Sequence, residues 1–183
     1  MKAFVIIHKL KYILILFAFL YLLNNIDTYP QDKSSYNNNH MSDSTLMHRQ
    51  HMIHEESPMV MPFKMNEVTH YFIKNDKGGV LMIKTKNKKD TAQAALVQNH
   101  LKKECKLFSN ADFRDPKTLH GMNMPGLKVL SGSKGKYNVE YKKLTDGAKL
   151  TFASKDSAVV NAIHVWFDAQ LRDHGSDARS KLD

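Results

Sequence analysis

The chain has 183 residues and a formal net charge of +9, with 42% hydrophobic and 25% charged residues. This composition is typical of a globular protein, and the single cysteine excludes an intrachain disulfide. The lysines are scattered and accompany no nucleic-acid-binding motif, so the positive charge indicates a solvated basic surface and no nucleic-acid partner.

Residues 1–27 are expected to export the rest of the chain. Lys2, Lys9 and Lys11 precede an unbroken apolar run at 12–23, and positive charges before an apolar segment keep the N-terminus cytoplasmic. The run is shorter than a membrane span of about 20 residues, and no clear cleavage site follows it. Residues 1–27 are therefore either a signal peptide or an uncleaved N-terminal membrane anchor. Both predict an exported protein, periplasmic or anchored to the outer face of the inner membrane.

Residues 28–57 are expected to form a flexible tether. They are polar, rich in Asn, Ser, Asp and His, and lack the periodicity of a helix or strand. Residues 58–178 are expected to form a single domain, followed by a tail at 179–183. A domain of roughly 120 residues can bury a hydrophobic core of its own.

Within this domain, the pattern predicts two strands, a helix, two more strands and a second helix. The strands are expected at 69–73, 80–85, 137–141 and 149–152, with a loop from 109 to about 125. Asp90 and Asp156 are expected to cap the two helices. The resulting fold is α+β, an antiparallel sheet with two helices on one face. Both helices open with Lys-Asp-(Thr/Ser)-Ala, which suggests a ββα duplication.

Methionine and histidine each occur 10 times and gather in three places. The first is 47–54, continuing to Met59 and Met61; the others are the Gly- and Pro-containing loop at 120–126 and the helix at 164–174. Imidazole binds copper in either oxidation state, and thioether sulfur favours Cu(I). Thiolates are prone to oxidation in an exported protein, so Met and His are the practical ligands there.

The candidate metal ligands come from these clusters and from one predicted strand. Before the first strand they are His48, His51, Met52, His54, Met59 and Met61. Beyond it they are His70, His120, Met122, Met124, His164 and His174. Each also has a structural alternative: a methionine in a strand or core, a core histidine with one hydrogen bond, or, for His174, a cation at a helix C-terminus. A copper ion is the expected cofactor.

The sequence holds no standard catalytic signature. An enzyme would use His120 or His164 as an acid or base. Nothing in the sequence selects one partner carboxylate from Glu104, Asp112, Asp115 and Asp168. Cys105 falls on the apolar stripe of the first predicted helix, where packing is the expected role.

Two motifs have a recognisable form: His-Gly-Met-Asn-Met-Pro-Gly-Leu at 120–127 and His-Val-Trp-Phe-Asp-Ala-Gln-Leu-Arg-Asp-His-Gly at 164–175. With Met-Val-Met-Pro at 59–62, they make the chain resemble an uncharacterised family of small exported bacterial proteins, often named aspartate carbamoyltransferase. The resemblance implies a shared fold and a shared His/Met pattern. Carbamoyl transfer does not follow from it, because this chain lacks a Ser-Thr-Arg-Thr phosphate-binding motif and is too short for two doubly wound domains.

The sequence therefore favours an exported metal-binding protein that handles copper through histidine and methionine. The alternatives are a small exported enzyme of unknown reaction and a non-catalytic envelope binding module. The partners expected are a metal ion and, if residues 1–27 are not cleaved, the membrane.

Overall fold

The computed structural model describes residues 42–182, and the predicted export segment lies outside them. Within this range a five-stranded open sheet and its helices form one domain, which confirms the α+β class. The strands are β1 (Val68–Asn75), β2 (Gly78–Thr85), β3 (Tyr137–Leu144), β4 (Gly147–Ser154) and β5 (Ala178–Arg179). The helices are α2 (Asp43–Glu56), α3 (Thr91–Ser109), α4 (Arg114–His120), α5 (Leu127–Ser131) and α6 (Ser157–His174). Between residues 42 and 182, no helix is long and apolar enough to cross a membrane.

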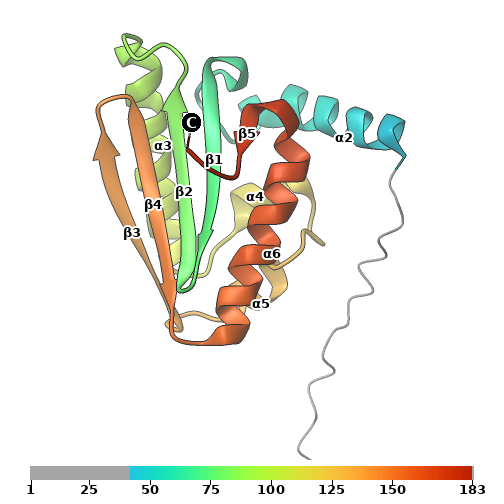
Figure 1. Cartoon of the computed structure of the whole chain (residues 1–183), viewed down its shortest axis with the longest axis vertical. Helices are drawn as coiled ribbons and strands as arrows, with labels where there is room; N and C mark the ends of the chain where they lie inside the picture. The colour runs from blue at the N-terminus through green and yellow to red at the C-terminus, as the bar shows by residue number, and fades with distance from the viewer. Residues whose placement is uncertain (1–41, 183) are drawn as a thin grey trace, which may run out of the picture. The chain divides into compact units, whose positions relative to one another are not determined.

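The sheet has the strand order β3-β4-β2-β1-β5 (Figure 1). The two predicted hairpins, β1–β2 and β3–β4, join side by side through an antiparallel pairing of β2 with β4. The four predicted strands pair antiparallel, as expected, and a fifth strand that was not predicted, β5, pairs with β1 in parallel, His70 opposite Ala178 and Tyr71 opposite Arg179. Part of the expected C-terminal tail thus belongs to the sheet. A two-residue strand is too short to leave an alternating pattern in the sequence.

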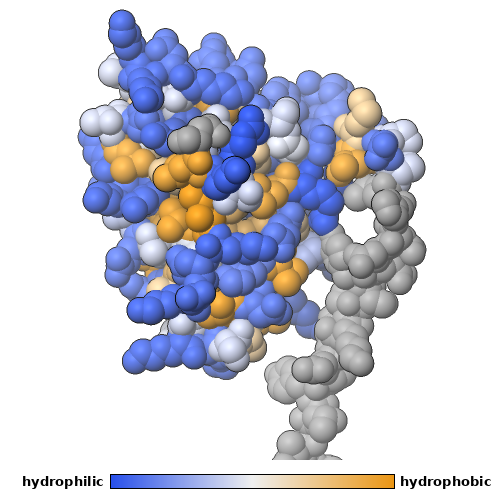
Figure 2. Space-filling model, viewed as in Figure 1, coloured by the Kyte–Doolittle hydropathy of each residue, from blue (hydrophilic) through white to orange (hydrophobic). Residues whose placement is uncertain are grey.

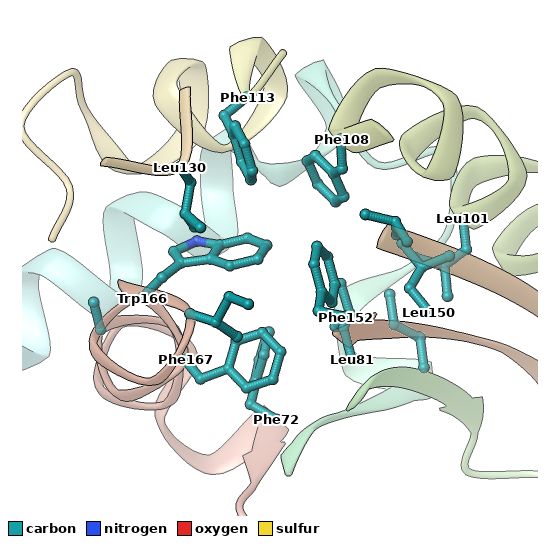
Figure 3. Close-up of a cluster of buried hydrophobic side chains, with 14 of the residues drawn as sticks. Phe72, Leu81, Leu101, Phe108, Phe113, Leu130, Leu150, Phe152, Trp166 and Phe167 are labelled. Atoms are coloured by element: carbon teal, nitrogen blue, oxygen red, sulfur yellow. The ribbon is translucent and has the colours of Figure 1, made fainter. Parts of the chain in front are cut away.

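Helices α3 and α6 pack on the same face of the sheet, as expected. Asp90 caps α3 by accepting a hydrogen bond from the Gln93 amide (3.0 Å), and Asp156 does the same for α6 from the Ala158 amide (2.9 Å). Phe152 of β4 contacts rings from both helices, at 5.8 Å from Phe108 of α3 and 5.5 Å from Trp166 of α6. Figure 3 shows this aromatic cluster joining the two helices over the strands.

The segment between α3 and β3 contains two short helices: α4 lies where a loop was expected from 109 to about 125, and α5 follows that stretch. Pro116 is compatible with α4 because it lies in the first turn, where an amide has no partner within the helix. Gly126 precedes α5 with φ +82°, and a Cβ there would lie 2.3 Å from the Ala162 carbonyl oxygen. A glycine is therefore needed for α5 to approach α6 this closely.

Residues 43–56 form α2, so the prediction of a flexible tether is wrong for that part of 28–57. Ser42 caps the helix through the Thr45 amide at 3.3 Å. Ile53 is the one buried residue of α2. The sequence of this helix therefore shows no regular spacing of apolar residues from which a helix could be predicted. Figure 1 shows α2 beside the C-terminal end of α6, where polar contacts hold it.

The face shown in Figure 2 is largely hydrophilic, with apolar side chains emerging near β1 and β2. The hydrophobic core lies on the other side of these strands, between the sheet and the helices α3 and α6. His70, although polar, lies on the core side with Val68 and Phe72, because alternate residues of a strand face the same way. The imidazole of His70 on β1 therefore lies in the core.

Candidate metal-binding cavity

A cavity of about 50 Å³ lies between β1, α3, α4 and α6. It is large enough for a few water-sized molecules. Four of the predicted ligands line it, although they come from well-separated parts of the chain: Met61, His70, His120 and His174. Most of the wall is apolar, and its titratable side chains form two groups, here called ends: His70, His120 and His174, and His100, Glu104 and Asp115.

The first end, here called the histidine end, consists of His70, His120 and His174. His70 is 2% exposed, and its ring stacks on His174 with centroids 4.7 Å apart. Within the described part of the chain, neither ring nitrogen of His70 has a hydrogen-bond partner, and Nδ1 of His174 also lacks one. Buried polar atoms without partners are rare in native structures, so these nitrogens call for a bound species.

Burial keeps His70 and His174 uncharged at pH 7. It lowers the pKa of His70 to about 3, helped by the nearby charges of His100 and His120. Burial also lowers the pKa of His174 well below its usual value. His174 is therefore neutral at pH 7, so the alternative of a helix-terminal cation fails. Neutral imidazoles offer the lone pairs that a metal ligand needs.

Asp173 orients the third histidine. His120 Nδ1 lies 3.0 Å from Asp173 Oδ2, and Arg49 of α2 donates to both carboxylate oxygens, at 2.8 Å and 2.6 Å. Burial alone would raise the pKa of Asp173, but the hydrogen bonds from Arg49 and His120 outweigh it and lower the pKa to about 2. A carboxylate on Nδ1 favours the tautomer that leaves Nε2 free, the arrangement common behind metal-binding histidines.

The second end, here called the carboxyl end, consists of His100, Glu104 and Asp115. His100 and Glu104 lie one turn apart on the buried side of α3, and Asp115 comes from α4. Glu104 is 2% exposed, and its Oε1 makes no hydrogen bond within residues 42–182, although Lys103 Nζ lies 3.9 Å away. Burial raises the pKa of Glu104 to about 8, reinforced by the hydrogen bond and charge of Asp115. Burial lowers the pKa of His100 to about 4.

The remaining domain ligands predicted from the sequence lie away from the cavity. His164 Nε2 is 3.0 Å from the Asn75 carbonyl oxygen and 2.9 Å from the Gly78 carbonyl oxygen. These contacts connect α6 to the turn between β1 and β2. Met122 is 75% exposed, whereas Met124 is buried in the core. Of the loop at 120–126, His120 thus lines the cavity, Met122 is exposed and Met124 is buried in the core.

The ligands predicted before the domain lie mainly on the outside of α2. His48, His51 and Met52 are exposed, at helical positions that share one side. His54 points elsewhere, with Nδ1 at 3.8 Å from Asp177. Met59 is 63% exposed on the turn that follows.

No three His, Cys, Asp or Glu side chains within residues 42–182 are already gathered closely enough to hold a metal ion. The stacked rings of His70 and His174 illustrate the reason, since their in-plane lone pairs do not meet at one point. A metal bound at the histidine end would require rings to turn within the cavity. Binding a metal would give the unpaired ring nitrogens of His70 and His174 a partner, which would favour such a rotation of the rings.

Sequence reasoning missed Arg49 and Asp173 and did not select Glu104 or Asp115. The spacing of His100 and Glu104 on the buried side of one helix was the only available signal. Contacts such as Arg49 with Asp173 join residues 124 positions apart, which no local pattern reveals.

Comparison of the chain with family models, with curated proteins and with solved structures gives no match. Function must therefore be argued from the cavity itself.

Proposed function

We propose that this chain is an exported metal-binding protein that handles copper, with Met61, His70, His120 and His174 as its ligands. The observation that carries the proposal is convergence. Four residues selected as ligands from the sequence line one small cavity, although they lie in four separate segments. Three of their ring nitrogens make no hydrogen bond with any residue from 42 to 182.

The chemistry of this set suits copper. Imidazole serves Cu(I) and Cu(II), and a thioether at Met61 favours Cu(I). His70 and His174 are neutral at pH 7, because burial lowers the pKa of His70 to about 3 and that of His174 in the same direction. Asp173 holds His120 with one nitrogen available. These residues would bind and orient the ion, while the apolar walls exclude water.

The export part of the proposal is supported by the basic, apolar character of residues 1–27. Met and His ligands fit that destination, because an oxidising compartment threatens thiolates more than thioethers or imidazoles.

The test is an oxygen-free Cu(I) titration of the full chain against a competing chelator. Met61→Leu should weaken Cu(I) binding by at least about tenfold, since it removes the cavity thioether while keeping the side chain's size. Met122→Leu is the matched control, because Met122 is exposed outside the cavity, and it should bind like the wild type. Absence of Cu(I) binding by the wild type, or equal losses in the two variants, would refute the copper site.

An acid–base enzyme is the second candidate. It is favoured by the Asp173–His120 pair and by Glu104, whose pKa burial raises to about 8, facing the same cavity. A cavity of about 50 Å³ favours an ion or a few waters over an organic substrate. The size of the cavity therefore ranks this candidate below metal binding.

A further inference from the structure

The helices leave one face of the sheet open. Helices α3 and α6 pack on the core side of the strands, α2 and α5 pack against α6, and α4 lies beside α2. Within residues 42–182, no helix therefore covers the opposite face of the sheet, here called the outer face. Figure 2 shows apolar side chains on this face near β1 and β2, among hydrophilic ones.

The outer face carries an apolar block on its two central strands. Tyr71 and Ile73 flank the core residue Phe72 on β1, so they point to the other side of the sheet. Their cross-strand partners on β2 are Met82 and Val80. Ile73 and Val80 are partly exposed. An antiparallel sheet that faces water normally turns polar residues outward, so this block departs from the pattern of a solvated face.

Cations flank the apolar block on both sides. Lys149 of β4 lies opposite Met82, and Lys142 of β3 lies opposite Lys149. At the other edge of the sheet, Arg179 of β5 lies opposite Tyr71. Two like charges directly opposite each other on neighbouring strands are unfavourable. An anion over the two lysines would relieve this repulsion.

The combination of apolar and basic side chains selects the occupant. Among the outward positions of the four long strands, Glu140 is the only acidic residue, and the chain carries a net charge of +9. A second copy would bring cations against cations. We propose that the outer face docks on an anionic membrane surface, with the apolar block in the interface and Lys142, Lys149 and Arg179 at the lipid headgroups. This contact does not depend on copper binding.

The chain itself would bring the domain to a membrane. The apolar run at 12–23 is expected to enter the membrane during export, and residues 24–41 connect it to the domain. Even when fully extended, this connection reaches at most about 65 Å. If the run stays inserted, the tether keeps the domain near the surface, where even a weak contact is populated because its effective concentration is high.

The test is lysine footprinting of the full chain on vesicles of phosphatidylglycerol and of phosphatidylcholine, with acetylation measured by mass spectrometry. The apolar run can enter both kinds of vesicle, so a difference between them reports on charge. Lys142 and Lys149 should be acetylated about fivefold more slowly on phosphatidylglycerol than on phosphatidylcholine. Lys102 and Lys106, exposed on α3 at the other side of the sheet, are the internal controls and should react equally on both.

A pair of variants tests the apolar block. Ile73→Thr/Val80→Thr makes both positions polar and keeps β-branched side chains, which suit a strand. It should return the acetylation of the two outer-face lysines on phosphatidylglycerol to the rate seen on phosphatidylcholine. Val129→Thr is the matched control, because Val129 is 46% exposed on α5, and it should react like the wild type.

Equal acetylation of Lys142 and Lys149 on the two kinds of vesicle would overturn the proposal, as would equal rates in the two variants. Equal protection of Lys102 and Lys106 would mean that no face is preferred and would also overturn it. Protection by polyglutamate but not by phosphatidylglycerol would identify an acidic protein partner instead of a membrane. Protection that appears without vesicles and rises with protein concentration would identify a second copy.

Discussion

The two ends of the cavity respond to the same burial in opposite directions. At the histidine end burial lowers the pKa of His70 to about 3, and at the carboxyl end it raises the pKa of Glu104 to about 8. Both shifts favour the uncharged form. Near pH 7, His70 is therefore a neutral base and Glu104 is mainly a neutral acid, and each has a buried atom without a hydrogen bond within residues 42–182. The first can accept a cation directly, whereas the second must release a proton to do so.

The two ends also differ in how they are anchored. Asp173 behind the histidine end is completely buried and is held by Arg49 of α2. Asp115 at the carboxyl end is held by Lys103, whose side chain is 58% exposed. An ion pair with a buried member is costly to break, whereas one that reaches water contributes little. Asp173 is thus held more firmly than Asp115.

Glu104→Gln should have the largest effect of the substitutions considered, and the effect should be on how the free energy of unfolding depends on pH. The unfolded carboxyl titrates near 4.5 and folded Glu104 at about 8, so the wild type loses stability as the pH rises through this window. By pH 9 the loss is on the order of 4 kcal/mol, and glutamine avoids it. Urea unfolding should find the variant more stable than the wild type at pH 9 and similar at pH 5. Parallel stability curves would show that Glu104 titrates normally.

Arg49→Met should have the next largest effect, because it leaves the buried Asp173 without its bidentate partner. A loss of about 3 kcal/mol in the free energy of unfolding is expected at pH 7. Lys74→Met is the control, since it breaks an ion pair with Asp168 in which both side chains are exposed, and it should cost under about 1 kcal/mol. Similar costs in chemical denaturation would argue against α2 as an anchor of the histidine end.

His70→Phe should have the smallest of these effects, on the acid side. Burial lowers the pKa of folded His70 to about 3 from 6.5. As the pH falls from 6.5 toward 3, the unfolded chain takes up a proton at this histidine and the folded chain does not, so the wild type loses stability. Between pH 7 and pH 5 the variant should lose about 2 kcal/mol less than the wild type. His51→Phe, on the exposed side of α2, should follow the wild-type curve because its side chain stays in water. A His70→Phe curve that matches His51→Phe would contradict burial as the cause.

The hairpins and long helices could be predicted because their signals are local. The first hairpin is marked by an Asn-Asp-Lys-Gly-Gly turn. The long helices are marked by Asp90 and Asp156, each of which accepts a hydrogen bond from an amide two or three residues further along. Helix α2 could not be predicted, since its contacts with α6 are polar and distant in sequence. Strand β5 is defined entirely by its partner β1.

The candidate site could be predicted only in part. Residue chemistry selected Met61, His70, His120 and His174, but the same reasoning selected His164 and Met122, which lie elsewhere. Spacing along the chain does not reveal which side chains converge. The carboxyl end needed the fold, because α4 brings Asp115 to Glu104 from a segment expected to be a loop. The ββα duplication stays a prediction.

Copper K-edge X-ray absorption of the Cu(I)-loaded full chain identifies the atoms that bind the copper. We expect imidazole nitrogen scattering together with a sulfur scatterer, and loss of that sulfur in Met61→Leu but not in Met122→Leu. Copper bound without imidazole, or a sulfur signal that Met61→Leu leaves unchanged, would contradict a copper site in this cavity.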